Sequence, residues 1–305
     1  ELGLVPSTSE GGRLQVHPPP LEANHVIRIK EQLFATSIGI FPDGSPLCVS
    51  YKHYSKPGFP EQLGLALYRV IECVPYGGIL IFLPSYSLLK KCTKVWKSGL
   101  FASQLSHITV LVENDAPFPT VKQNYLDAIT NKGFAILFAV YRGKMSEGIS
   151  FNDNFARCVI CIGLPYPNAF DRSVTAKRAY NNEQQRTRRE ADGGVLCGDK
   201  WYSQQAYRAL GQALGRCVRH AGDYGAIVLL DQRHCGFSRN SLPKWMRGAV
   251  TNLRNWDELK QSMVQFFASA KVVADAVLER QQQDLNAVAS RKRTAQASAA
   301  AAAAA

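Results

Sequence analysis

Long apolar runs are missing from this sequence of 305 residues, and no segment approaches the length of a membrane span. The first residues, ELGLVPSTSEGG, are polar and glycine-rich and lack the apolar core of a secretory signal. We therefore expect no partner in a membrane. The sequence does not begin with Met, so we expect it to be part of a longer protein.

A complete phosphate-binding loop of the type GxxxxGK[ST] is also absent, and no strand-like run ends in a DEAH-like acidic pair. These motifs hold the phosphates and the Mg²⁺ of a bound nucleotide. The segment GKMS at 143–146 comes nearest, but the required earlier glycine would fall at Phe138. The chain therefore lacks the primary pocket of an ATPase.

The cysteines form neither a disulfide framework nor a pattern of metal ligands. Cys158 and Cys161 make a CxxC motif, but no second pair follows at zinc spacing, and the motif lies in an apolar run. We expect buried thiols in a reducing compartment.

Acidic residues are outnumbered, with 24 Asp and Glu against 36 Lys and Arg, and the net charge is +12. This excess favours an anionic partner, either nucleic acid, polyphosphate or an acidic protein surface. A basic surface kept for solubility would explain the charge as well. A basic RNA-binding domain of another fold is disfavoured, because the aromatic signatures of such domains are absent.

Apolar runs of strand length alternate with helix-like stretches along the chain. The runs lack polar alternation, as in strands covered on both faces, and lie at 78–85, 108–113, 135–141, 157–163 and 225–231. The helix-like stretches lie at 61–74, 86–98 and 120–131. This order predicts an α/β fold with a parallel sheet. Parallel sheets bind ligands at the carboxyl ends of their strands, so we expect chemistry in the loops after Ser85, Tyr141 and Gly163.

The two ends of the chain differ in composition from its middle. Residues 1–20 are rich in Gly, Ser and Pro and are expected to form a linker, followed by one domain over 21–275. A helix and a mobile loop are expected over 172–200, and a capping helix from Trp256 to about Val273. Residues 276–305 are low in complexity and are expected to be disordered; their SRKR motif is compatible with nuclear import.

The segment QALGRCVRH at 212–220 is rich in positive charge. Two weak helix formers, Gly211 just before it and Gly215 within it, accompany this charge. If the helix runs through this segment, a stripe of apolar residues faces the core: Leu210, Leu214, Cys217 and Val218. The opposite face then carries Gln212, Arg216 and Arg219, with Arg208 on the same side.

Arginines without local carboxylates suit an anion that arrives from outside the helix, because a guanidinium donates two hydrogen bonds to phosphate at once. The glycines would allow another backbone or a nucleotide to approach closely. The alternative is a solvated arginine face with incidental glycines. A second candidate is YRGKMSEGISF at 141–151, where glycines and a lysine follow a strand and could face a phosphate.

Four motifs together resemble the second RecA-like lobe of superfamily 2 DNA helicases. They are ILIFLPSYSLL, AVYRGKMSEGISF, CIGLPYPN and WYSQQAYRALGQALGRCVRHAGDYGAIVLLDQR. The resemblance extends from about Leu21 to Ala268. It is closest to the iron–sulfur, XPD-like branch with the Fanconi anaemia group J and RTEL helicases, and it implies a RecA-like parallel sheet flanked by helices with a C-terminal helical cap.

The resemblance implies roles for individual residues. Arg216 and Arg219 match the catalytic arginines that reach the γ-phosphate of ATP across the cleft between two lobes. The residues that match contacts to the nucleotide are Gln212, Gly148 and Ser150. The residues that match contacts to DNA are Ser85, Tyr86, Lys144 and Ser146. Ser150 departs from the family, which usually has Asp there, and this puts coupling through that position in doubt. Ser85 would also serve as a simple helix N-cap.

By this resemblance the chain is the second motor lobe of an ATP-dependent 5′-to-3′ DNA helicase in DNA repair or genome maintenance, and it is nuclear. Its implied partners are single-stranded or forked DNA, the first lobe and repair proteins. ATP and Mg²⁺ would be held mainly by the absent first lobe, which would also hold a 4Fe–4S cluster, and we expect no metal site here. This chain alone would be inactive. The alternative is a scaffold that binds nucleic acid or protein without hydrolysis, as the missing phosphate-binding loop and Ser150 suggest; the intact arginines favour the motor.

Overall fold

The computed structural model describes residues 4–6, 14–16, 25–147, 151–187, 196–236 and 241–304. Its centre is a parallel seven-stranded sheet with the order β5-β6-β4-β7-β8-β3-β9. The strands are β3 (Leu33–Ile38), β4 (Gly77–Leu83), β5 (Thr109–Val112), β6 (Phe134–Val140), β7 (Cys158–Ile162), β8 (Gly225–Leu230) and β9 (Thr251–Leu253). The five predicted strands are confirmed as β4 to β8, and so is the predicted fold class.

Strands β3 and β9 were not predicted, because polar residues interrupt their apolar pattern. Thr36 and Ser37 of β3 are buried, and both hydroxyls donate to the backbone oxygen of Thr251 in β9 at 3.3 Å. Buried hydroxyls are tolerated when they are hydrogen-bonded in this way. The partner strand is more than 200 residues away in sequence, so the pairing leaves no local signal.

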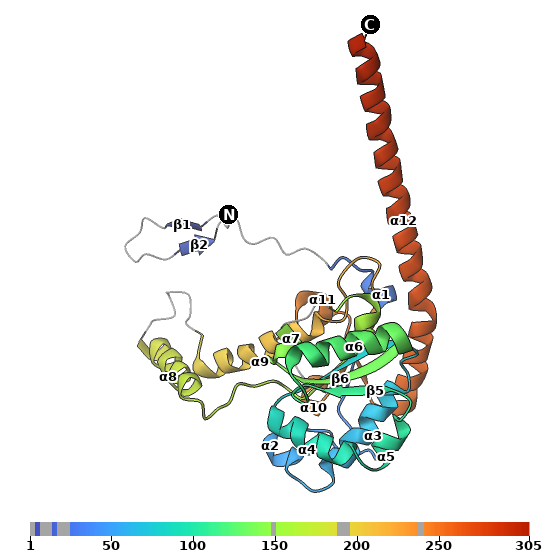
Figure 1. The fold of residues 1–305 in the computed structure, drawn as a ribbon. Helices are drawn as coiled ribbons and strands as arrows, with labels where there is room; N and C mark the ends of the chain where they lie inside the picture. Colours follow the sequence, from blue (N-terminus) through green and yellow to red (C-terminus); the bar gives the residue numbers. More distant parts are fainter. Residues whose placement is uncertain are drawn as a thin grey trace.

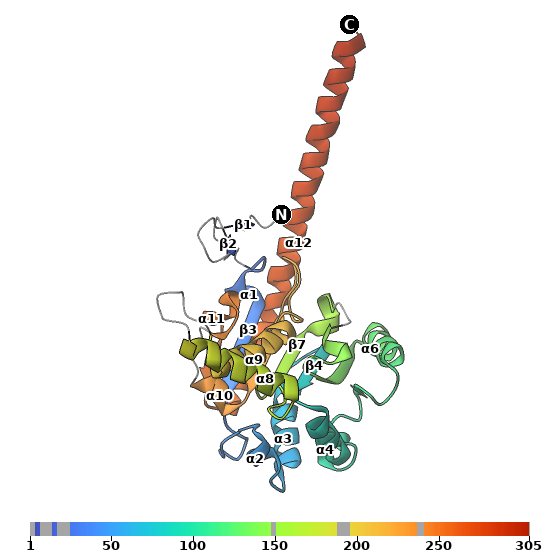
Figure 2. The ribbon, with the colours of Figure 1, turned by 90° about the vertical axis from the view of Figure 1, so that its left-hand side faces the viewer.

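Helices cover both faces of the sheet (Figures 1 and 2). One apolar cluster lies between the sheet and α3 (Phe59–Ile71), α4 (Tyr86–Trp96), α5 (Leu100–Gln104) and the start of α12 (Trp256–Ala304). The other lies under α1 (Ile29–Gln32), α6 (Phe118–Lys132), α9 (Gly198–Leu214) and α11 (Lys244–Arg247). The predicted helices at 61–74, 86–98 and 120–131 are thus confirmed as α3, α4 and α6.

Shorter elements complete the chain. They are α2 (Tyr51–Tyr54), α7 (Lys144–Glu147), the 3₁₀ helix η1 (Asp153–Ala156), α8 (Arg172–Thr187), α10 (Gln232–Cys235) and the antiparallel pair β1 (Leu4–Pro6) and β2 (Leu14–Val16). Helix α8 confirms a helix within 172–200, whereas the rest of that segment up to residue 195 lies outside the described residues. Short strands in the predicted linker were not expected.

Helix α9 ends earlier than the sequence predicts. It stops at Leu214 with Gly215 as its C-cap, and the N–H groups of Arg216 and Cys217 bond three residues back, which tightens the turn. The prediction that Gln212, Arg216 and Arg219 share one helix face is therefore wrong. The predicted burial of Leu210, Leu214, Cys217 and Val218 is confirmed, although the last two residues lie beyond the helix.

Helix α12 continues far beyond its predicted end near Val273. Its core side chains repeat every three or four residues from Trp256 to Ala274, and the helix then leaves the body of the domain (Figure 1). Residues 276–304 continue this helix instead of forming the expected disordered tail; alanine, abundant there, is the strongest helix former. The domain limits at 20 and 275 stay a prediction. Among the described residues, no helix combines the length and hydropathy of a membrane span.

A histidine in α10, the short helix after β8, makes the free energy of unfolding depend on pH. The Nε2 atom of His234 lies 3.3 Å from the backbone oxygen of Gly163, and burial lowers the pKa of His234 to about 4. The unfolded chain takes up this proton near the ordinary value of about 6.5. As pH falls between these values the unfolded state binds more protons, so the free energy of unfolding should fall, by at most about 3 kcal/mol.

Urea unfolding at about pH 7.5 and about pH 5 measures this loss. We expect it to be larger in the wild type than in His234→Gln, which cannot take up a proton there. Equal losses in the two proteins would show that another group is responsible.

Candidate functional site

A groove lies at the carboxyl ends of strands β4, β7 and β8, with a volume of about 590 Å³. We call it the tyrosine groove. It is lined by Val49, Ser50, Tyr51, Tyr54, Pro84, Ser85, Ser87, Leu164, Tyr166, Pro167, Asn168, Tyr202 and Arg233. Two of the three loops in which we expected chemistry, those after Ser85 and Gly163, thus meet at one groove.

The rings of the tyrosine groove are held in place by local contacts. Tyr166 stacks on Tyr202 with centroids 5.2 Å apart and an interplanar angle of 21°. The Tyr202 hydroxyl donates to the backbone oxygen of Pro167 at 2.7 Å, and the Arg178 guanidinium lies 4.8 Å from the Tyr202 ring centroid. On the other wall Tyr51 is 76% exposed and contacts Tyr54 edge-on. The groove therefore offers flat apolar faces, one of them largely open to solvent.

A fixed cation closes one side of this groove. Arg233 donates from Nε and Nη2 to the two carboxylate oxygens of Asp231, at 2.9 and 2.8 Å. Burial opposes the charge of Arg233, but the hydrogen bonds and charge of Asp231 outweigh it and raise its pKa. Asp231 is buried and also accepts from the Val49 N–H at 2.9 Å. One carboxylate thus positions both the cation and the segment that carries Tyr51.

Ser85 and Tyr86, both predicted DNA contacts, point to different places. Ser85 lines the tyrosine groove and also caps α4, because its Oγ accepts from the Leu88 N–H at 3.3 Å. The Tyr86 hydroxyl donates to Glu113 at 3.2 Å, away from the groove lining. Burial and the adjacent carboxylate raise the pKa of Tyr86 to about 12, so the hydroxyl keeps its proton.

Glu113, which the sequence analysis did not single out, organises the loop after β6. Its carboxylate is buried and accepts from the N–H groups of Val140 at 2.8 Å and Met145 at 3.1 Å. A Cβ atom on Gly143 would lie 2.6 Å from this carboxylate, which explains the glycine. Glu113 therefore fixes the start of the segment that resembles a phosphate-facing loop.

Lys144 is exposed and lines a separate cavity of about 390 Å³ with Glu113, Asn114, Ala116, Pro117, Phe118, Val121 and Met145. It does not line the tyrosine groove. The side chain of Ser146 lies outside the described part of the structure, as do Gly148 and Ser150, so their predicted roles stay predictions.

The end of α9 forms a second open surface, which we call the α9 groove. Its volume is about 660 Å³, and it is lined by Gln204, Tyr207, Arg208, Gly211, Gln212, Ser241, Leu242 and Pro243. The glycine at 211 permits a close approach, since a Cβ there would lie 3.3 Å from the Pro243 side chain. No acidic residue contributes to this lining within the described residues.

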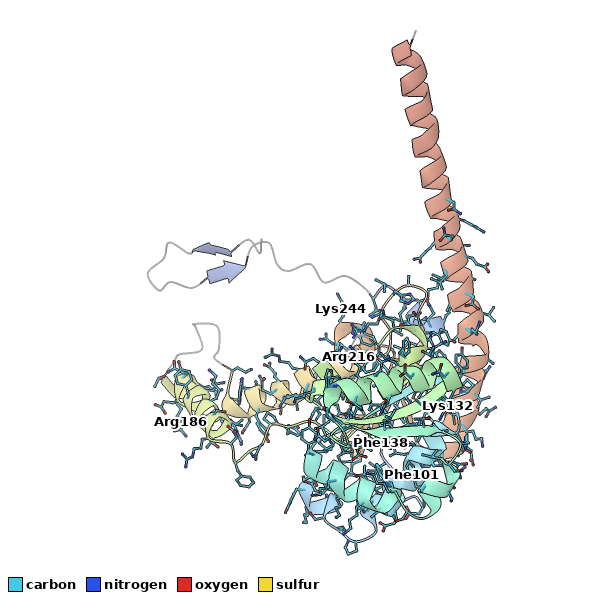
Figure 3. The ribbon with its side chains drawn as sticks, viewed as in Figure 1. Phe101, Lys132, Phe138, Arg186, Arg216 and Lys244 are labelled. Atoms are coloured by element: carbon cyan, nitrogen blue, oxygen red, sulfur yellow. The ribbon has the colours of Figure 1, made fainter. Side chains whose placement is uncertain are left out.

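Arg216 and Arg219 follow the helix. Arg216 is half-buried at the end of α9, on the side where α11 packs (Figure 3). Arg219 is exposed, and its guanidinium forms no hydrogen bond or ion pair with the part of the chain that the structure describes. Its backbone N–H instead donates to Asp223 at 3.0 Å. The backbone is therefore anchored while the charged group stays open to solvent.

A buried ion pair supports this turn. Asp223 and Arg157 are both buried and lie 2.7 Å apart, and Asp223 also accepts from the Tyr224 N–H at 2.9 Å. The Arg157 guanidinium lies 4.0 Å from the Tyr224 ring centroid and also bonds to the backbone oxygen of Tyr224. Asp223 thus holds the Arg219 N–H and, through Arg157, fixes the turn to the residue that precedes β7.

The helicase C-terminal domain family matches this chain over residues 67–249, a span that contains both grooves except for the segment 49–54. The chain belongs to this family. This match confirms the resemblance inferred from the sequence motifs.

Curated relatives include the Fanconi anemia group J protein homolog of Gallus gallus, 42% identical over 260 residues. Another is the regulator of telomere elongation helicase 1 homolog of Drosophila ananassae, 35% identical over 268 residues. These matches cover 81% and 86% of this chain, whereas the chain spans 20% and 26% of those relatives. Among solved structures, that of S. tokodaii Xpd4 aligns with a TM-score of 0.47 and 17% identity, over 73% of this chain and 38% of that one.

The helicase domain has functional candidates that the sequence analysis missed, namely Tyr51, Tyr166, Tyr202 and Arg233. Tyr166 lies in the quoted motif CIGLPYPN and Arg233 at the end of the longest motif, so their positions were visible but their convergence was not. Tyr51 follows the unpredicted strand β3 and carried no motif. The buried thiols of Cys158 and Cys161 in β7 agree with the prediction made for them.

Proposed function

We propose that this helicase domain is the second motor lobe of an ATP-dependent DNA helicase of the XPD-like branch. One observation carries the proposal: helix α9 contributes Tyr202 to the tyrosine groove near its start and Gln212 to the α9 groove near its end. Their separation of ten positions corresponds to about 15 Å along the helix. A rigid element therefore joins a surface suited to nucleobases to one suited to phosphates.

The α9 groove and the turn after it face ATP that is held on the first lobe. Arg216 and Arg219 supply positive charge to the γ-phosphate, and Gln212 contacts the nucleotide. The exposed Arg219 guanidinium forms no ion pair with the described residues, so it can reach an anion without breaking one. Gly148 and Ser150, which follow α7 in the sequence, complete the nucleotide contact in this proposal.

Arginine side chains and the Gln212 amide suit polyphosphate, whereas Mg²⁺ prefers oxygen ligands such as carboxylates. Because the described lining of the α9 groove includes no carboxylate, Mg²⁺ belongs to the first lobe in this proposal. The 4Fe–4S cluster of the branch belongs there as well.

The tyrosine groove holds single-stranded DNA. Aromatic faces stack on successive bases irrespective of sequence, and cations along the groove follow the phosphates. Ser85 and Arg233 contact the backbone beside these rings. Lys144, Ser146 and Tyr86 are further DNA contacts in this proposal. Closing the lobes around ATP brings Arg216 and Arg219 to the γ-phosphate. The lobes open after hydrolysis, and the two lobes bind the DNA strand tightly in turn.

In this proposal the longer protein moves 5′-to-3′ on single-stranded or forked DNA in the nucleus. The names of the relatives, a Fanconi anemia group J protein and a regulator of telomere elongation helicase, support a role in genome maintenance with repair proteins as partners. A scaffold that binds DNA without hydrolysis is the second candidate, favoured by Ser150. ATP hydrolysis by the longer protein separates the two. The present chain alone should show none, and turnover by it would contradict the two-lobe proposal.

Removing the exposed ring of the tyrosine groove tests the DNA contact. Tyr51→Ala should weaken binding of a labelled oligothymidylate to this chain by about 5- to 150-fold, because one base loses its stacking partner, worth about 1–3 kcal/mol. Fluorescence anisotropy measures the dissociation constant.

Tyr180→Ala is the matched control, since Tyr180 is 55% exposed on α8 and does not line the groove. Its affinity should be unchanged. Affinity should also fall steeply with added salt if phosphates are bound. Equal effects of the two substitutions, or an affinity independent of salt, would rule out this groove as the DNA site.

A further inference from the structure

The edge of the sheet formed by β5 is open. Strand β5 is the last in the sheet order and pairs only with β6 among the described strands. The Glu113 N–H donates to the Phe138 oxygen at 2.8 Å, so residues 109, 111 and 113 direct their backbone groups to β6. In a parallel pair the intervening residue faces the other way. The N–H and C=O of Val110 therefore lie on the free edge, and Val110 is 41% exposed.

The strand at this edge has few of the features that protect edge strands. Natural sheets shield their edges with very short strands, lysine, proline or bulges. The opposite edge strand, β9, has only three residues. Strand β5 is also short, with four residues, but its sequence Thr-Val-Leu-Val contains neither charge nor proline. An apolar edge strand of this kind is suited to pairing with another strand.

An apolar pocket lies beside the free edge, with a volume of about 220 Å³. We call it the β5 pocket. It is lined by Thr93, Trp96, Lys97, Phe101, Ala102, Leu105, Val110, Val112, Asp115 and Phe138. Figure 3 shows Phe101 and Phe138 on the side of the sheet that faces α4 and α5. A dry cavity of about 150 Å³ accepts a benzene ring, so the β5 pocket has room for one aromatic side chain.

Lysines flank the free edge at both ends. The Lys132 Nζ atom lies 3.2 Å from the Thr109 Oγ1 atom at the start of β5. At the other end Lys97 and Asp115 form an ion pair at 2.8 Å. The one carboxylate in the pocket lining is therefore already paired, whereas Lys132 has no acidic partner among the described residues. This charge pattern favours a ligand that carries acidic groups beside its apolar anchor.

We propose that β5 is a docking edge for an extended acidic segment of a partner protein, which adds a strand beside Val110 and places one aromatic side chain in the β5 pocket. Main-chain hydrogen bonds to Val110 supply affinity, and the pocket selects the anchor. The β5 pocket shares no lining residue with the tyrosine groove or the α9 groove. A partner could therefore bind while the domain works, and the inference stands apart from the proposed motor function.

The probe is the peptide acetyl-Asp-Glu-Thr-Phe-Thr-Val-Glu-amide, with a second peptide in which alanine replaces phenylalanine. Calorimetry with the present chain should show binding of the phenylalanine peptide at least about tenfold tighter, because burial of the ring contributes more than about 1.4 kcal/mol. Methylation of the backbone nitrogens should abolish binding. No binding of the phenylalanine peptide up to about 1 mM, or equal binding of the alanine peptide, would overturn the proposal.

Val110→Lys blocks the edge, and Val264→Lys is its matched control, because Val264 is 50% exposed on α12. The first should lose at least about tenfold in peptide affinity and the second none. Ala102→Leu fills the pocket without altering β5 and should also weaken binding, with thermal unfolding as the check on folding. Equal losses at positions 110 and 264 would contradict the docking edge. Sedimentation that shows a dimer broken only by Val110→Lys would assign the edge to a second copy of this chain and overturn the partner segment.

Discussion

Replacing Arg219 with alanine in the longer, two-lobed protein should lower the rate of ATP hydrolysis by about 10³- to 10⁵-fold, the contribution typical of an arginine that stabilises transferred phosphate. The guanidinium of Arg219 is exposed and contributes no ion pair to the described fold, so its removal should leave the domain intact. Arg219 does not line the tyrosine groove, so affinity for single-stranded DNA should be retained.

Arg186→Ala provides the control, because the Arg186 side chain is 80% exposed near the end of α8 and forms a weak ion pair with Glu183, at 3.9 Å. Steady-state hydrolysis and DNA anisotropy are measured on the same preparations. Loss of hydrolysis in Arg219→Ala alone supports the motor. Parallel loss of both activities would place Arg219 in DNA binding or folding, and full hydrolysis would favour the scaffold.

The sheet was predictable because its central strands are buried on both faces. Every residue of β4, β7 and β8 is buried, so each strand appears in the sequence as an unbroken apolar run. The same rule could not find β3, where Thr36 and Ser37 satisfy their hydroxyls on a strand distant in sequence. An apolar run in the sequence indicates a buried strand. A buried polar residue whose hydrogen-bond partner is distant in sequence leaves no such run, so its strand is not predicted.

The candidate site was predictable in its motifs but not in its geometry. Gln212, Arg216 and Arg219 were identified, yet the end of α9 depends on a turn whose anchor, Asp223, lies beyond the predicted helix. The tyrosine groove draws its rings from three segments that only the fold brings together: 51–54, 166 and 202. Glu113 was overlooked because a single acidic residue after a strand has no motif of its own, although it holds the loop of Lys144.

Removal of one partner of the buried pair of Arg157 and Asp223 should strongly destabilise the fold. Asp223→Ala leaves the Arg157 charge buried without its carboxylate, a change that typically lowers the free energy of unfolding by about 3–5 kcal/mol. It also removes the acceptor of the Arg219 N–H. Urea unfolding at neutral pH measures the loss.

Asp199→Ala is the matched control, because Asp199 is 79% exposed and pairs with Arg178 at 2.6 Å on the surface. Its effect should stay below about 1 kcal/mol. The double variant Arg157→Met with Asp223→Leu removes both charges and should recover much of the lost stability, since apolar replacement of a buried pair is often neutral. In the two-lobed protein this variant should nevertheless hydrolyse ATP slowly, because the Arg219 N–H has lost its anchor. Recovery of hydrolysis together with stability would show that Asp223 serves the fold and does not position Arg219.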